Sequence, residues 1–205
     1  MSKSLLIVVV IASLALVLGL GGCSAYNGLV TLDQGVEAQW SQVENAYQRR
    51  ADLIPNLVKT VQGAADFEKS TLTEITEARA SVGKIQLNGV PDAAQLEQYE
   101  AAQGSLGRAL GRLMVIVEKY PELKANANFS ALQAQLEGTE NRIAVERGRF
   151  NETVQAYNTR IRSIPAVFFA GALGFHPRAY FKSTAGAETP PEVNFDFKSG
   201  DAAPR

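Results

Sequence analysis

The sequence holds one cysteine, Cys23, and one histidine, His176. One cysteine cannot form an intramolecular disulfide, and the two residues together supply too few ligands for a Cys/His metal site. Glu137 and Glu140 share one face of a predicted helix, but a di-iron bundle also needs Glu-x-x-His pairs, and His176 follows the helices. Motifs for phosphate binding, dinucleotide binding, helical zinc sites and nucleophile elbows are missing from the sequence. We therefore expect no cofactor, no metal and no enzymatic activity.

Cys23 suggests a different kind of chemistry, namely lipidation. It follows Leu-Gly-Gly at the end of an uncharged apolar run, residues 5–20, which Lys3 precedes. This arrangement resembles the bacterial lipobox, in which small residues precede a cysteine that is exposed by cleavage and linked to diacylglycerol. The run is also about 16 residues long, at the short end for a membrane helix. We predict that residues 1–23 are a lipoprotein signal or anchor, and either route places the remaining chain on the extracytoplasmic side.

The composition favours a helical domain. Hydrophobic residues make up 46% of the 205 residues and aromatic residues only 8%, while Ala, Leu, Gln and Glu dominate the middle of the chain. A formal net charge of −1 offers no electrostatic basis for binding nucleic acid.

The elements that position the polar residues follow from the spacing of apolar residues. Between residues 36 and 85 apolar side chains recur every three or four positions, which is a helical pattern. The pattern crosses Pro55 without a break, so it predicts one kinked helix from about residue 33 to 84, with a hairpin at Pro55 as the alternative. Two further helices are expected at about 93–120, capped by Asp92, and at about 131–163, capped by Ser130. The predicted fold is an all-α bundle of three long helices, or of four if the chain reverses at Pro55.

The chain divides into five predicted segments. After the anchor (1–23) come a spacer (24–32), the helical bundle (33–165), an apolar segment (166–182) and a flexible tail (183–205). We expect residues 166–182 to pack on the end of the bundle, with an amphipathic contact to lipid or to a partner as the alternative.

Polar residues inside the helices are the candidate interaction sites. One group near Pro55 comprises Arg49, Arg50, Asp52 and Asn56, with Asn45 one turn before them. A second group lies on the last helix and comprises Glu140, Asn141, Arg142, Arg147, Asn151 and Asn158. They form either a solvated face with weak ion pairs or an interhelical network in which the Arg49/Asp52 region meets Glu140; a ligand-binding use is a third possibility. We select Trp40 and the first group as the first candidates for contact with a partner.

Several motifs together resemble the LemA family. They are Val43-Glu-Asn-x-Tyr47-Gln-Arg-Arg-x-Asp52-Leu-Ile-Pro-Asn, Tyr120-Pro-x-Leu-Lys-Ala-Asn126, Leu136-Glu-x-Thr-Glu-Asn-Arg-Ile143 and Phe150-Asn-x-x-Val-x-x-Tyr-Asn158, within a region from Tyr26 to Phe197. The resemblance implies an exported, membrane-anchored bacterial protein built from long α-helices, and it supplies no catalytic residue. The sequence departs from the family at Glu146, where members often carry a small residue.

These observations favour a non-enzymatic scaffold or adaptor of the cell envelope. It would be held at the membrane by acyl chains on Cys23 or by an uncleaved helix, and would bind a membrane protein or further copies of itself. The alternative is a lipid-binding or small-ligand-binding protein that uses residues 166–182. A concave apolar pocket would favour the ligand binder, and a flat helical surface with exposed apolar residues would favour the adaptor.

Overall fold

The computed structural model describes residues 3–63 and 69–182, without the side chains of residues 3, 6–11, 14–18 and 20. Every regular element in this part of the chain is a helix. The elements are α1 (Lys3–Gln62), α2 (Lys69–Gly83), α3 (Ala93–Val117), α4 (Pro121–Lys124), α5 (Ala127–Arg162) and the 3₁₀ helices η1 (Ala166–Phe168) and η2 (Gly171–Leu173). The predicted all-α class is therefore confirmed for the described residues.

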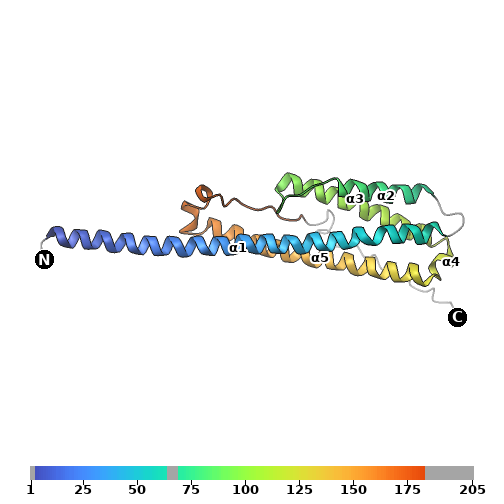
Figure 1. The fold of residues 1–205 in the computed structure, drawn as a ribbon, viewed down its shortest axis with the longest axis horizontal. Helices are drawn as coiled ribbons and strands as arrows, with labels where there is room; N and C mark the ends of the chain where they lie inside the picture. The colour runs from blue at the N-terminus through green and yellow to red at the C-terminus, as the bar shows by residue number, and fades with distance from the viewer. Residues whose placement is uncertain (1–2, 64–68, 183–205) are drawn as a thin grey trace, which may run out of the picture.

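The helices form an elongated bundle (Figure 1). α1 and α5 run antiparallel along the length of the molecule, and α2 and α3 form a second antiparallel pair beside them. Each long helix has one apolar stripe, and pairing the stripes removes them from water. The N-terminal part of α1 extends beyond the rest of the bundle at one end (Figure 1).

The prediction of three long helices was wrong, because the first one is divided. α1 ends at Gln62 and α2 begins at Lys69, with residues 64–68 outside the described part. The chain reverses here, close to Gly63, since α2 returns alongside α1 (Figure 1). Glycine is a poor helix former, which favours a helix end at this point. The four-helix alternative gives the right number of long helices, but with the reversal after Gln62 instead of at Pro55.

Pro55 lies inside α1, and the helix continues past it for two turns. Proline has no N–H to donate to the carbonyl oxygen four residues earlier, which belongs to Ala51. That oxygen instead accepts a hydrogen bond from Nε of Arg79 on α2, at 2.9 Å. A side chain from the neighbouring helix thus replaces the hydrogen bond that Pro55 removes.

α1 begins well before the predicted position. Residues 24–32, the expected spacer before a helix starting near Asp33, are part of this continuous helix. Among the described residues, no helix is long and apolar enough to cross a membrane.

The ends of α3 and α5 show how local sequence sets helix boundaries. Asp92 caps α3 as predicted: its carboxylate accepts from the backbone N–H of Gln95 at 2.8 Å, and the Gln95 side chain accepts from the N–H of Asp92. α5 begins earlier than predicted, because Asn126 and not Ser130 is the cap. The Asn126 side-chain oxygen accepts from two backbone N–H groups of the first turn.

The core consists of two apolar clusters arranged along the bundle. One joins the C-terminal half of α1 to α2, α3, α4 and the start of α5, and includes Leu57, Ile75 and Leu113. The other joins the middle of α1 to α3, to the C-terminal half of α5 and to the segment after α5. The second cluster is therefore complete only when residues 166–182 are in place.

Residues 166–182 do more than cover the end of the bundle. Ala166 and Ala170 are buried just after the end of α5. The chain then turns back and runs along the bundle as far as Phe181, which is buried in the second cluster (Figure 1). The predicted flexible tail, 183–205, lies outside the described residues.

Candidate interaction surface

Trp40, a candidate for partner contact, lies in the core. Its side chain is 1% exposed. Its ring packs edge-on against Tyr99 and Phe150 and stacks on Phe181 at 6.0 Å, with 20° between the two planes. Trp40 therefore joins α1, α3, α5 and the C-terminal segment, and it is not accessible to a partner in this conformation.

Arg50 is also buried, at 3% exposure. Its guanidinium donates to a carboxylate oxygen of Glu140 on α5 at 2.7 Å, and to the side-chain and backbone oxygens of Gln103 on α3. It also lies 5.3 Å from the ring centre of Tyr47. An interhelical polar network is therefore present, with Arg50 in the place where we expected Arg49 or Asp52.

A second ion pair lies beside the first. Arg147 on α5 contacts Glu100 on α3 at 2.5 Å and donates to the backbone oxygen of Lys182 at 3.1 Å. Its guanidinium also lies 4.5 Å from the ring centre of Phe181. Arg147 thereby ties α3 and the C-terminal segment to α5.

Two asparagines and one ion pair hold the C-terminal segment along the bundle. The side chain of Asn158 accepts from the backbone N–H of Arg178 and donates to its backbone oxygen, both at 2.9 Å. Asn151 makes the same pair of hydrogen bonds with Phe181 at 2.9 and 3.0 Å. The Arg178 guanidinium also pairs with Asp33 of α1 at 2.9 Å. Burial lowers the pKa of Arg178, but the hydrogen bond and negative charge of Asp33 outweigh this effect and raise it overall.

Glu146 is a buried acidic residue, and the sequence did not indicate that it is buried. It is 1% exposed and contacts Arg142 at 2.7 Å and Arg149 at 3.2 Å. Its other carboxylate oxygen accepts from the Gln39 side chain of α1 at 2.7 Å. The extra acid therefore links α5 to α1.

The other candidates are exposed and lie on one face of α1. Arg49, Asp52 and Asn56 are separated by three and four residues, so they follow one another along the helix on the side away from the core. Asp52 accepts a hydrogen bond from Gln48 at 2.7 Å. No ion pair of Arg49 is found among the described residues.

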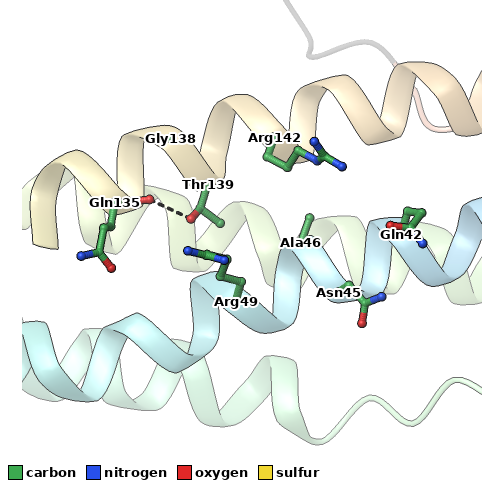
Figure 2. A pocket seen from close by; sticks show the side chains of 8 residues that line it. All are labelled: Gln42, Asn45, Ala46, Arg49, Gln135, Gly138, Thr139 and Arg142. Carbon is green, nitrogen blue, oxygen red and sulfur yellow. Dashed lines mark hydrogen bonds between the residues drawn. The ribbon is translucent and has the colours of Figure 1, made fainter.

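The same face of α1 borders an open groove of about 510 Å³ between α1 and α5 (Figure 2). Its lining residues are Gln42, Asn45, Ala46, Arg49, Gln135, Gly138, Thr139 and Arg142. Two of these residues carry a positive charge and none carries a negative charge. The Thr139 hydroxyl donates to the backbone oxygen of Gln135 within its own helix, as the dashed line in Figure 2 marks. The groove thus offers an occupant the guanidinium of Arg49, that of Arg142, which is also paired with Glu146, and several amides.

Cys23 and His176 are the residues that were considered first for chemistry. Both are exposed. No group of three or more His, Cys, Asp or Glu side chains that could hold a metal ion occurs among the described residues.

Comparison with known proteins finds a matching family model and several relatives. The family model of the LemA family matches residues 39–195. Magnetosome protein MamQ 2 of Paramagnetospirillum magneticum is 30% identical over 184 residues, covering 80% of this chain and 67% of its own. Magnetosome protein MamQ of Magnetospirillum gryphiswaldense is 30% identical over 187 residues with the same coverage. Protein LemA of Metamycoplasma hominis is 21% identical over 158 residues, covering 77% of this chain and 69% of its own.

The fold defines a class, an elongated antiparallel bundle whose long helices are joined by partly buried ion pairs and completed by a C-terminal segment. Within that class, the chain belongs to the LemA family, as its motifs predicted. The matched region, residues 39–195, lies inside the region of resemblance from Tyr26 to Phe197.

Proposed function

We propose that this protein is a non-enzymatic, membrane-anchored protein of the cell envelope, and that it acts as a scaffold or adaptor by binding another protein in the α1–α5 groove. The observation that supports this function best is the groove itself. It is open to solvent along two neighbouring helices, which suits an added helix better than an enclosed small molecule.

The charges of the groove indicate the chemistry of the partner. Arg49 has no ion pair among the described residues, while Arg142 shares the carboxylate of Glu146 with Arg149. A helix that carries Asp or Glu toward the groove would complete these charges through bidentate contacts with the guanidinium groups. The partner is therefore a membrane protein, or a second copy of this chain, that presents an acidic helical segment.

Membrane anchoring is the second part of the proposal. Its basis is the apolar sequence of residues 5–20 followed by Cys23, which is either cleaved and acylated or kept within an uncleaved helix. The bundle then lies on the extracytoplasmic side. The MamQ relatives are named for the magnetosome and not for a reaction, which supports a non-enzymatic role.

A photo-crosslinking amino acid at Asn45, inside the groove, tests the adaptor function in cells. The control carries the same group at Gly107, an exposed position on α3. Each is combined with Arg49→Glu, and with Arg108→Glu as a matched charge reversal on the exposed face of α3. We expect the probe at Asn45 to crosslink one distinct membrane protein. This crosslink should persist with Arg108→Glu and disappear with Arg49→Glu.

The other outcomes separate the alternatives. Crosslinks only between copies of this chain would indicate a self-assembling scaffold. The same pattern of crosslinks from Asn45 and from Gly107, or no crosslink at all, would remove the groove as the binding site.

The alternative function, lipid or small-ligand binding by residues 166–182, has one supporting observation. Ile164, Phe168 and Leu173 are exposed apolar side chains at one end of the bundle. Binding of a radiolabelled lipid by the purified chain, lost with Phe168→Ser but retained with Arg49→Glu, would favour this alternative.

A further inference from the structure

Exposed apolar side chains gather where α1 leaves the bundle. Four lie on the turn after α5, namely Ile164, Val167, Phe168 and Leu173, and two lie on the adjoining part of α1, Tyr26 and Val30. We call these six residues the apolar end patch. Ile164 and Phe168 are 76% and 79% exposed, so most of their surface meets water unless another molecule covers it. Apolar residues gathered in this way mark a contact site more reliably than single exposed ones.

The turn that carries the patch is held firmly from beneath. Ala166 and Ala170 are buried against the bundle. The backbone N–H of Val167 donates to the oxygen of Ser163 at 2.9 Å, and that of Ala170 donates to the oxygen of Ala166 at 2.8 Å. Gly174, with φ of 86°, adopts a left-handed conformation that reverses the chain after η2. The outward direction of Val167 and Phe168 is therefore built into the fold.

The patch lies just beyond the apolar run of α1. Phe175, which follows the turn, contacts the ring of Tyr26 with 5.9 Å between ring centres, and Arg160 at the end of α5 reaches Gly28. At 1.5 Å per helical residue, Tyr26 is roughly 9 Å along the axis from Leu20, the last residue of the run. The headgroup layer on each side of a bilayer is about 5–8 Å thick. The 16 residues of the run span roughly 24 Å, whereas the hydrocarbon core is about 30 Å thick. If the run starts at one face of the core, the core extends roughly 6 Å past Leu20, and Tyr26 then lies in the headgroup layer.

The charges at this end also suit a lipid surface. Residues 4–32 contain no charged side chain, and residues 153–182 contain no acid but four basic residues. Arg160 and Arg162 lie in the last turn of α5, next to the patch. Guanidinium groups there would meet lipid phosphates at the same depth.

We propose that the apolar end patch inserts into the interfacial layer of the same membrane that holds the N-terminal part of α1. This inference rests on the membrane anchoring in the proposed function. With α1 fixed in the bilayer and continuous into the bundle, the turn gives the bundle a second point of contact. Two contacts determine how the bundle tilts and rotates above the membrane, and hence which way the α1–α5 groove faces. A protein partner is less suitable here, because the projecting part of α1 stands beside the patch, whereas lipid fits around a helix.

The experiment places a polarity-sensitive fluorophore on the turn of the full chain. Cys23→Ser removes the native thiol, and Gly171→Cys introduces the labelling site, where an added side chain meets no atom within 4 Å. The control site, Gly148→Cys on α5, is equally open. It lies roughly 21 Å along α5 from the end of that helix. The protein is reconstituted in vesicles of phosphatidylethanolamine and phosphatidylglycerol, at no more than one copy per vesicle, and quenched with aqueous iodide or with doxyl-labelled lipid.

We expect the Gly171 label to be quenched by the doxyl lipid and to be several-fold less sensitive to iodide than the Gly148 label. The double variant Ile164→Ser/Phe168→Ser should make the Gly171 label accessible to iodide quenching again, while the chain still floats with the vesicles. Val145→Ser, a matched change of an exposed apolar residue of α5 away from the patch, should change neither result. Circular dichroism checks that each variant is folded.

The outcomes distinguish this inference from the anchoring on which it rests. Chain that floats with vesicles, with equal iodide quenching at both sites, would overturn the inference and leave the anchoring intact. Chain that floats only when Cys23 is kept would leave anchoring by acylation intact but overturn the inference, which needs residues 5–20 in the bilayer. Chain that floats neither with Cys23 nor with Cys23→Ser would overturn both. Protection that appears only with several copies per vesicle would show that a second copy, and not lipid, covers the patch.

Discussion

The cluster of Arg50, Gln103 and Glu140, in which Arg50 and Gln103 are buried, gives a quantitative test of the fold. Replacing Arg50 by methionine keeps most of the apolar stem but removes the guanidinium. Gln103→Leu removes the amide that accepts from it. The two changes are made separately and together in the full chain, with Arg49→Met as an exposed control beside Arg50.

The structure sets the expected sizes. Glu140 is 62% exposed, so its carboxylate regains water when Arg50 is removed, and that ion pair is worth about 0–1 kcal/mol. The buried Gln103 side-chain oxygen cannot bind water in the same way, and leaving it unpaired costs about 1–3 kcal/mol. Arg50→Met should therefore lower the free energy of unfolding by about 1–3 kcal/mol. Gln103→Leu should cost a similar amount, because the buried charge loses a hydrogen-bond acceptor.

The double variant has neither the charge nor the unpaired oxygen. Replacing a buried polar cluster by apolar side chains of similar size is often neutral, so we expect it to return to within about 1 kcal/mol of the wild type. Arg49→Met should change stability by less than about 0.5 kcal/mol, as exposed substitutions usually do.

Urea unfolding of the detergent-solubilised chain measures these differences. The chain has one tryptophan, Trp40, which is buried in the adjoining cluster, so its fluorescence reports directly on this region. Circular dichroism supplies a second signal for the two-state test. Losses that simply add in the double variant would refute the coupling between Arg50 and Gln103, and an Arg50→Met loss no larger than that of Arg49→Met would refute the burial of Arg50.

Three further predictions follow from individual contacts. Asn151→Ala should speed hydrogen exchange at the Phe181 amide, and Asn158→Ala should speed it at the Arg178 amide, because each change removes the acceptor of that N–H. Unchanged exchange at both amides would show that these asparagines do not hold the C-terminal segment. Arg79→Ala should destabilise the chain by about 1–3 kcal/mol by leaving the Ala51 carbonyl unpaired, and by distinctly less when Pro55→Ala restores the N–H within α1, which a double-mutant cycle measures by urea unfolding. Burial raises the pKa of Tyr99 to about 12 from its ordinary value of 10, so folding favours the neutral phenol. The stability that comes from keeping Tyr99 neutral is complete below pH 10 and is lost as the pH rises toward 12. Two pKa units correspond to about 2–3 kcal/mol, and Tyr99→Phe should flatten the alkaline fall in stability by this amount; an equally steep fall would show that Tyr99 is not responsible.

The helical class and several helix ends were predictable because their causes are local. Three-to-four-residue spacing defined the apolar stripe of α1, and Asp92 with Gln95 defined the start of α3. The division after Gln62 was missed because Pro55 was taken as the only strong break in the region. The structure shows why Pro55 does not end α1: a side chain from α2 supplies the missing hydrogen bond.

The candidate surface was predicted in part, and the errors concern burial. Arg50 and Trp40 were selected as candidates for contact with a partner, although both follow the core spacing of Val43, Tyr47 and Ile54. That spacing was the available signal for their burial. Arg49, Asp52 and Asn56 remain exposed, and Arg49 borders the groove with α5.

The sequence by itself determined that the chain is helical, that its N-terminal run is apolar and that it belongs to the LemA family, since propensity, spacing and motifs are carried by the residues alone. Only the tertiary structure decided which charged residues lie inside and what they meet. Arg50 and Glu140 are 90 residues apart in the chain, and Asp33 and Arg178 are 145 apart. Contacts over such separations depend on how the helices are aligned along one another and on where the C-terminal segment lies, and both are set by the packing of the whole molecule.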